Sequence, residues 1–253
     1  MTGSAHTKHA RSHTGAVVLV LLCGTACYKD HALPPQIPNG GHVELRLAMN
    51  YGSLPFVLGQ GYLYPGDRTI HFTRLKVLFS GLGMVDDTHV LVDQFHRSVF
   101  MFDPQGPAVL ALGSMPAGHM GDLVLRPGAA GVMGLDDPLN ADWPLDDADM
   151  FVHGDPEQGR YILRLEGYVD MDGDGVFTPG VDSAFVHLPH GQPTPVVQIA
   201  PAQQQTMAPG GHVTRILTLD VLFLLLGVDV LEQNEGPGGA CDRLVQNLPG
   251  ALH

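Results

Sequence analysis

Short apolar runs, separated by Gly, Pro, Asn and Asp, recur along most of the chain. The sequence contains 32 Gly and 20 Pro, yet 44% of its residues are hydrophobic, which is enough apolar side chain for a core. Runs of about four to eight residues between such breakers are typical of β-strands. We therefore expect an all-β fold with long loops, either a sandwich or a barrel.

The clearest strand is 160–168, where polar and apolar side chains alternate, and 42–49 shows a similar alternation. Further strands are expected at 62–64, 69–72, 75–82, 90–93, 98–102, 119–125, 183–188, 195–199 and 213–219. Residues 128–158 contain many acidic side chains and predict a long loop with about one helical turn. The dense apolar run 221–231 predicts either a buried strand or a short core helix, and 242–248 predicts a short C-terminal helix.

The N-terminus has the features of a secretory signal. Lys8 and Arg11 precede an apolar run at 16–22, which is far shorter than the roughly 20 residues that cross a bilayer. A Gly-Thr-Ala-Cys motif that ends at Cys27 looks like a lipobox, in which the Cys is lipidated and becomes the first mature residue. Residues 1–26 are therefore predicted to be a lipoprotein-type signal peptide. A secreted protein without lipid is the alternative.

The rest of the chain divides into a tether and one domain. Residues 27–41 are rich in Pro and Gly and lack a pattern, which suits a tether. Residues 42–253 have the size of a single domain. We expect an exported protein, periplasmic or on the outer surface, that meets the membrane only through the lipid on Cys27. Its formal charge of −13 at pH 7 repels phosphate backbones, so nucleic-acid binding is not expected.

The acidic segment 170–182 has the spacing of a calcium loop. Ca²⁺ takes about six to eight oxygen ligands, and carboxylates at alternate positions converge on one point when Gly175 permits the sharp turn. The predicted ligands are the side chains of Asp170, Asp172, Asp174 and Asp182 and the backbone carbonyl of Val176. The flanking segments are expected to be strands rather than helices. The alternative is an acidic hairpin loop held by Asx turns, without a metal.

Three histidines lie near the ends of predicted strands. His187 and His190 stand near the end of the strand at 183–188, and His153 precedes the strand at 160–168. Imidazole is a ligand that suits copper or zinc. The alternative is that each is an ordinary hydrogen-bonding residue, which is the commoner role of a His at a strand end.

The sequence contains no Gly-x-Ser-x-Gly, His-Glu-x-x-His, phosphate-loop or Cys-x-x-Cys motif. We therefore expect a protein that is not an enzyme. Cys241 would be the one Cys of the domain, so no internal disulfide is expected. Its thiol is a buried small side chain, a free thiol or a metal ligand.

Four short segments occur in an informative order. They are 73–80, 118–123, 160–167 and 184–188, and Asn247 follows near the C-terminus. In this combination the chain resembles the MbnP-like family of periplasmic copper-binding proteins, which is associated with methanobactin handling. The resemblance implies an antiparallel β-sandwich that holds copper through a few His ligands. It also implies a partner, a di-haem c-type cytochrome peroxidase-like protein.

The resemblance points to particular ligands. His187 lies in a matching segment, and His153 lies where relatives carry a Met-x-Trp-x-Trp pattern before the Arg-Leu-Glu-Gly strand. Val152 and Gly154 stand where the tryptophans would be, so a site with an oxidised Trp is not expected. His190 is the third candidate, since a strand end can turn back within a few residues.

Two functions follow from these observations. The first is an exported lipoprotein that scavenges or carries copper, which needs His153 and His187 close in space, and that carries a structural calcium loop. The alternative is a calcium-stabilised β-sandwich with an adhesive or structural role and no copper site, which needs only the Asp loop.

Overall fold

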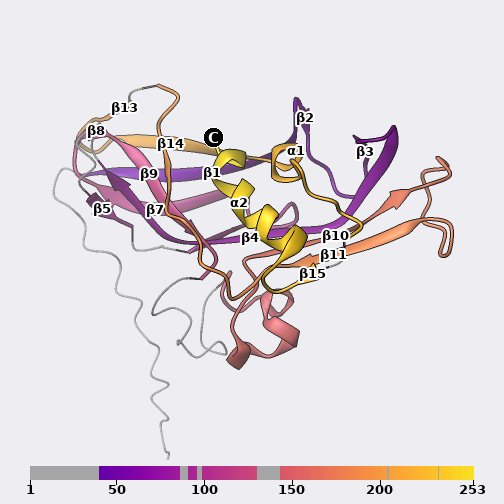
Figure 1. The fold of residues 1–253 in the computed structure, drawn as a ribbon. Coiled ribbons are helices and arrows are strands. Elements are labelled where there is room, and N and C mark those ends of the chain that lie inside the picture. Colours follow the sequence, from indigo (N-terminus) through magenta and orange to yellow (C-terminus); the bar gives the residue numbers. More distant parts are fainter. Residues whose placement is uncertain (1–39, 86–90, 96–98, 130–142, 204, 233) are drawn as a thin grey trace, which may run out of the picture. The chain divides into compact units, whose positions relative to one another are not determined.

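The computed structural model describes residues 40–253, apart from 86–90, 96–98, 130–142, 204 and 233 (Figure 1). The predicted signal peptide and nearly all of the predicted tether lie outside the described residues. In the part of the chain that is described, no helix is long and apolar enough to cross a membrane.

Strands form most of the regular structure, as the sequence predicts. One sheet contains β1 (Gly41–Tyr51), β2 (Leu54–Pro55), β7 (Val109–Met115) and β14 (His212–Asp220). The larger sheet contains β3 (Gly61–Tyr64), β4 (Arg68–Val85), β5 (Leu91–Gln94), β6 (Phe100–Phe102), β9 (Asp122–Pro127), β10 (Leu163–Asp170), β11 (Ser183–Leu188), β12 (Val197–Ile199) and β15 (Asn234–Glu235). β8 (Gly118–Met120) pairs with β13 (Gln205–Met207) in a small third sheet.

The two larger sheets share one core and form the predicted β-sandwich. Val43 and Leu45 of β1 belong to the same buried cluster as Phe72 and Leu75 of β4. The named strand pairs are antiparallel except for β1 with β14 and β11 with β15, which run parallel. The longer path in the larger sheet runs β12-β9-β4-β10-β11-β15, so β4 and β10 lie at its centre.

A bulge in β4 explains why the sequence predicts two strands where the structure has one. Phe72 pairs with Gly167 and Arg74 pairs with Glu166 of β10, so one residue of β4 has no opposite number. A bulge of this kind resets which face the following side chains occupy. Phe72 and Leu75 are therefore both fully buried although they are an odd number of positions apart. The break between the predicted strands 69–72 and 75–82 lies at this bulge.

Two helices follow β14. α1 (Val221–Leu224) is a single turn, capped by the Asp220 side chain, which accepts from the N–H groups of Leu222 and Phe223. The helix alternative for the apolar run at 221–231 is the one the structure contains. α2 (Gly239–Ala251) confirms the predicted C-terminal helix and extends it at both ends. It contacts β14 of one sheet and β11 and β15 of the other (Figure 1).

From residue 143 on, the segment between β9 and β10 packs on the larger sheet. Its described part contains three 3-10 turns: η2 (Ala148–Met150), η3 (Val152–Gly154) and η4 (Pro156–Gln158). Lys76 of β4 holds the segment, because its Nζ lies 2.7 Å from Asp147 Oδ2 and 3.1 Å from Asp149 Oδ2. Met150 and Val152 are buried with Leu78 in a second, smaller apolar cluster. This anchoring fixes the turn that carries His153.

Candidate metal sites

The end of β11 places His190. The parallel pairing of β11 with β15 sets Leu188 opposite Glu235. The Leu188 carbonyl accepts from Gly236 N and from His190 Nδ1, both at 3.1 Å. Since a carbonyl only accepts, Nδ1 of His190 is the donor in this bond, and in the neutral ring Nε2 has the lone pair. A backbone bond to one ring nitrogen is the usual way in which a metal-binding His is oriented.

The η3 turn places His153. Its backbone is left-handed, with φ of 53° and ψ of 22°, a conformation that costs a non-Gly residue about 1 kcal/mol or more. The surrounding bonds hold it there: His153 N donates to the hydroxyl of Tyr161 at 3.0 Å. The imidazole Nδ1 then lies 3.3 Å from Glu235 Oε1.

Tyr161 connects the parts of this site. Its side chain is 4% exposed, and its hydroxyl donates to Glu235 Oε1 at 2.9 Å while accepting from His153 N. Burial raises the pKa of Tyr161 more than the accepted hydrogen bond lowers it, so the hydroxyl keeps its proton at neutral pH and remains a donor. The Tyr161 ring lies edge-on to His190, with centroids 5.5 Å apart.

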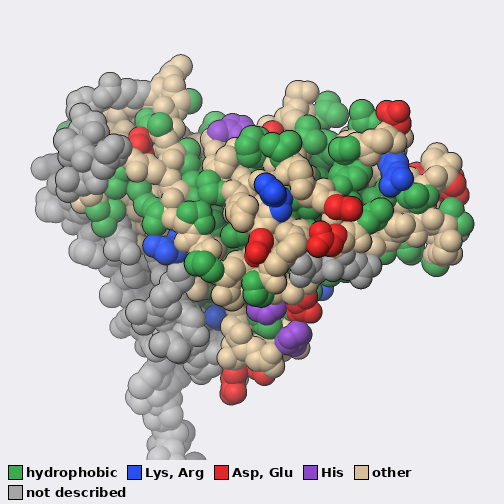
Figure 2. All heavy atoms as spheres, in the orientation of Figure 1, with side chains coloured by type: hydrophobic (Ala, Val, Ile, Leu, Met, Phe, Trp, Pro, Cys, Tyr) green, Lys and Arg blue, Asp and Glu red, His purple; other side chains and the backbone are tan. Residues whose placement is uncertain are grey.

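His153, His190 and Glu235, which we call the His–Glu cluster, therefore lie near one another on three separate segments, and their ligand atoms do not all come within 4.8 Å of one another. The ring centroids of the two histidines are 6.3 Å apart. In the space-filling view, His and acidic side chains lie next to each other on the part of the surface beneath α2 (Figure 2). Two imidazole nitrogens and a carboxylate oxygen form a donor set that suits a transition metal such as copper.

The remaining predicted ligand, His187, lies in the core. Its side chain is fully buried, its Nε2 donates to the carbonyl of Val230 at 3.1 Å, and its ring stacks on Phe185. Burial lowers the pKa of His187, which keeps the ring neutral. Its Nδ1 has no hydrogen-bond partner. None of the contacts found among the described residues joins His187 to His153 or His190. Of the three predicted histidine ligands, the structure therefore places His153 and His190 near each other and His187 apart from them.

Cys241 is also buried. Its thiol lies against the backbone N–H of Leu188, on the strand that leads to His190. Burial raises the pKa of the thiol to about 11. The thiol is therefore protonated at neutral pH, whereas the thiolate is the form that binds metals.

The Asp loop is built from consecutive residues between β10 and β11. Asp170, Asp172 and Asp174 each offer a carboxylate oxygen, and the three oxygens lie within 4.8 Å of one another. In the described part of the chain, this is the group of three or more His, Cys, Asp or Glu side chains that meets that spacing. Gly173 and Gly175 take φ of 78° and 76°, which closes the turn and which L-residues with a side chain rarely adopt.

Backbone N–H groups orient the loop's carboxylates. Asp170 accepts from Gly173 N at 2.6 Å and from Gly175 N at 2.8 Å. Asp182 accepts from Met171 N at 2.8 Å and from Thr178 N at 2.7 Å. These bonds tie both ends of the loop to its base. The same pattern is what the Asx-turn alternative requires, so the loop is preformed whether or not it holds an ion.

The carboxyl groups of the loop differ in the direction of their pKa shifts. Partial burial raises the pKa of Asp170, but hydrogen bonds from Gly175 and Gly173 lower it further, so the net shift is downward. The Asp174 N–H lowers the pKa of Asp172, yet partial burial and the charges of Asp174 and Asp182 outweigh it and raise the pKa overall. A hydrogen bond between the carboxyls of Asp170 and Asp172 adds to that rise. A cation at this point would offset the repulsion between these carboxylates.

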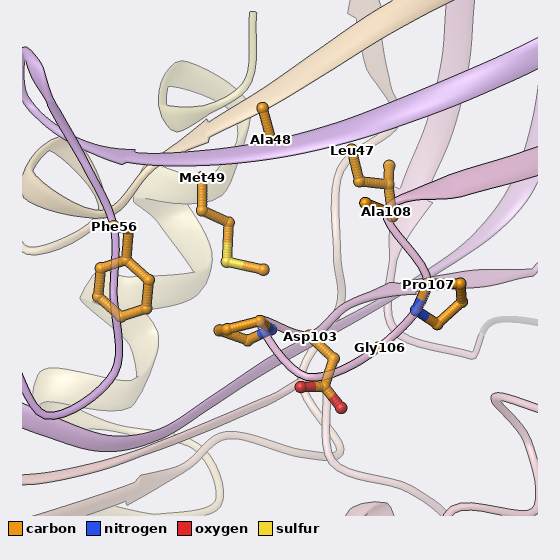
Figure 3. Close-up of a pocket in the computed structure, with 9 residues that line it drawn as sticks. Leu47, Ala48, Met49, Phe56, Asp103, Gly106, Pro107 and Ala108 are labelled. Carbon is orange, nitrogen blue, oxygen red and sulfur yellow. The ribbon is translucent and has the colours of Figure 1, made fainter.

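A separate pocket of about 190 Å³ lies between β1 and the turn at 103–108 (Figure 3). Most of its lining residues have apolar side chains, with the Met49 thioether and the Phe56 ring on one side. The Asp103 carboxylate on the other side already accepts from Gln105 N at 2.8 Å and lies 3.8 Å from Lys76 Nζ. No residue of either candidate metal site lines this pocket.

The comparisons with known proteins bear on the fold. No family model and no curated protein matches the sequence. Among solved structures, MbnP from Methylosinus trichosporium matches with a TM-score of 0.50 and 14% sequence identity, over 80% of this chain and 83% of that one. The chain has an MbnP-like fold. At 14% identity the match establishes the fold. Which residues bind a metal has to be argued from the side chains of this chain.

The MbnP-like fold confirms the resemblance that the sequence suggests and the β-sandwich that it implies. Sequence reasoning did not find Glu235 or Tyr161. Glu235 directly precedes Gly236-Pro237-Gly238-Gly239, which indicates a turn and carries no sign of a ligand. Its place in the cluster depends on the pairing of β15 with β11, which no local pattern predicts.

Proposed function

We propose that the chain is an exported copper-binding protein, without enzymatic activity, that scavenges or carries copper through His153 and His190. The observation that carries this proposal is the meeting of the two imidazoles, from segments 37 positions apart in the sequence, with a carboxylate beside them. The MbnP-like fold supports it, because the family that the sequence resembles binds copper through His.

The cellular setting is part of the same proposal. The charged N-terminus, the apolar run at 16–22 and the motif that ends at Cys27 support export and a lipid anchor. A di-haem c-type cytochrome peroxidase-like protein is the partner that the sequence resemblance supports. Mass spectrometry of membrane-extracted protein tests the anchor, because a chain that begins at an acylated Cys27 has a mass that no unmodified product shares.

Copper retention tests the proposal that His153 and His190 bind copper. The protein is incubated with copper, desalted and analysed for copper per chain. We expect near-stoichiometric copper in the wild type and little in the His153→Ala/His190→Ala variant. His187→Gln is the matched control, since a Gln amide can replace the bond from His187 Nε2 to the Val230 carbonyl. Equal copper in the wild type and the double variant would refute the proposal, and copper loss in His187→Gln alone would move the site to the core histidine.

A structural calcium ion in the Asp loop is the second part of the proposal. It is supported by the three carboxylate oxygens within 4.8 Å of one another and by the raised pKa of Asp172. If the chain binds calcium and takes up no copper, the function is that of a calcium-stabilised β-sandwich with an adhesive or structural role.

A further inference from the structure

We infer that the pocket between β1 and the turn at 103–108 is a binding site for a small uncharged molecule that combines an apolar ring with a primary amide. The inference goes beyond the proposed metal functions and does not depend on them, because no residue of the candidate metal sites lines this pocket. It rests on an interruption in the pairing of β1, on two backbone groups at that interruption, and on the walls of the pocket (Figure 3).

One edge of β1 is paired by two different strands that leave a gap between them. β14 pairs the other edge of β1 over residues 42–50, so β7 and β2 share this edge. β7 pairs with Gly41–Arg46, and β2 pairs with Asn50–Tyr51. Residues 47–49 therefore have none of the described strands opposite them on this edge. The turn at 103–108, which leads into β7, lies across the gap and makes it a pocket of about 190 Å³.

Two hydrogen bonds define which backbone groups face the gap. Leu47 N donates to the Ala108 carbonyl at 2.8 Å, and Phe56 N donates to the Met49 carbonyl at 3.0 Å. A residue in a strand directs its N–H and its C=O to the same edge. The Leu47 C=O and the Met49 N–H therefore also face the gap, and neither has a hydrogen bond within the part of the chain that is described. Unpaired groups on a strand edge are available for further pairing, so they offer a ligand one acceptor and one donor.

The walls of the pocket favour an aromatic body for the ligand. The Met49 thioether and the Phe56 ring lie on one side, and Pro104 and Pro107 of the turn also line the pocket. Aromatic rings pack well against other rings and against thioethers. A cavity of about 150 Å³ holds one benzene molecule, so a pocket of about 190 Å³ has room for one ring that carries a small polar group.

The charges around the pocket favour an uncharged ligand. Asp103 is the ionisable side chain among the lining residues. Its carboxylate already accepts from Gln105 N at 2.8 Å and lies 3.8 Å from Lys76 Nζ. Figure 3 shows this carboxylate turned away from Met49 and Phe56. A cation would therefore find its counter-charge already engaged, and an anion would lie near a carboxylate of the same sign.

The ends of the gap determine the kind of occupant. The bond from Leu47 N to Ala108 closes one end, and the bond from Phe56 N to Met49 closes the other, so an extended chain from a partner has no path along this edge. A primary amide suits the gap, because its N–H and C=O lie on the same side of one group. The N–H would donate to the Leu47 C=O, and the C=O would accept from the Met49 N–H.

A ligand titration of the ¹⁵N-labelled full chain, followed by nuclear magnetic resonance, tests the inference. Benzamide is the probe, because it combines one ring with a primary amide. Acetophenone is the matched ligand, since it keeps the ring and the acceptor and has no N–H. Ala108→Leu adds bulk at an exposed position that lines the pocket, and Ala111→Leu is the control, at an exposed position of β7 outside the lining.

We expect benzamide to bind with a Kd of about 1 mM and to shift the amide resonance of Met49. Acetophenone should bind about tenfold more weakly, because it leaves the Leu47 C=O without a donor. Ala108→Leu should abolish the shift, and Ala111→Leu should titrate as the wild type does.

Three results would overturn the inference. The first is a Met49 resonance that benzamide does not move in the wild type. The second is equal binding of acetophenone and benzamide, or equal binding of benzamide by Ala108→Leu and the wild type. The third is tighter binding of a blocked tri-alanine peptide than of benzamide, which would make an extended chain the occupant.

Discussion

The Asp loop and the His–Glu cluster are two candidate metal sites built in opposite ways. The loop draws its ligands from 13 consecutive residues, 170–182, and its own backbone N–H groups orient them. The cluster draws its ligands from three segments that meet only because β15 pairs with β11 and Lys76 holds the η2–η3 region on β4. The loop can therefore form wherever the two flanking strands form, while the cluster requires the whole sandwich.

The first prediction from this difference concerns the effect of calcium on the free energy of unfolding. At a calcium concentration about 100-fold above its Kd, binding adds about 2.7 kcal/mol to the free energy of unfolding, which corresponds to about 5–10 °C in Tm for a domain of this size. Asp172→Ala should lose most of this increase, because it removes a ligand whose side chain is exposed in the ion-free loop. Calorimetry with calcium and with a chelator measures it.

The chelator arm is the control for that prediction. The exposed side chain of Asp172 accepts a long 3.4 Å bond from Asp174 N, so its replacement should change the ion-free Tm little. An equal loss of Tm in calcium and in chelator would show that Asp172 stabilises the loop as an Asx turn and would contradict the calcium site.

The cluster should depend on groups outside its ligands, unlike the loop. Tyr161→Phe removes the donor to Glu235 and the acceptor for His153 N. We expect copper affinity to fall about tenfold with calcium affinity unchanged, both measured by isothermal titration. Met150→Leu is a control, since Met150 is buried in the same apolar cluster as Tyr161 and bonds to Tyr161 N through its backbone carbonyl, which the substitution keeps. Unchanged copper affinity in Tyr161→Phe would show that the cluster does not need its positioning bond.

The backbone of His153 offers a finer test. Its left-handed conformation is easy for Gly and costs about 1 kcal/mol or more for Ala. Both His153→Gly and His153→Ala should lose copper, but the Gly variant should have a free energy of unfolding about 1 kcal/mol higher than the Ala variant in urea. A Gly variant that is less stable than the Ala variant would mean that the turn is not left-handed in solution.

The smallest effect concerns His187, which distinguishes a core histidine from a ligand. Burial lowers its pKa in the folded state, so the unfolded chain binds the proton more readily. Its contribution to stability is complete above the unfolded pKa of about 6.5 and is lost as the pH falls from there towards the folded pKa. Urea unfolding of the wild type and His187→Gln between pH 7.5 and about pH 5 should show a shallower pH dependence in the variant. Identical slopes would show that this ring does not titrate with folding.

The same contrast, between local patterns and non-local contacts, explains which parts of the fold and the candidate sites the sequence predicts. Alternating side chains identify the strands at 42–49 and 160–168, which are β1 and β10, and the spacing of the acids identifies the Asp loop, because both are local patterns. The strand β7 was not predicted: Val109–Met115 contains Ala, Gly and Ser and has no clear alternation. It forms because β1 offers an edge on which it pairs.

The His–Glu cluster was predictable only in part. The sequence indicates His153 and His190 because they lie near the ends of predicted strands, and the family resemblance adds support for His153, but their proximity depends on non-local contacts. His187 was chosen from the family resemblance, and the structure places it inside the core against Phe185 and Val230. Glu235 and the partner strand β15 could not be inferred, because a two-residue strand leaves no periodicity to detect.

Pulsed electron paramagnetic resonance on the Cu(II)-loaded protein tests the central claim most directly, because the remote nitrogen of each bound imidazole modulates the copper signal. The account predicts modulation from two imidazoles in the wild type and from one in His153→Ala and in His190→Ala, with no bound copper left in the double variant. Modulation from two imidazoles that persists unchanged in either single variant, or that disappears in His187→Gln, would contradict it.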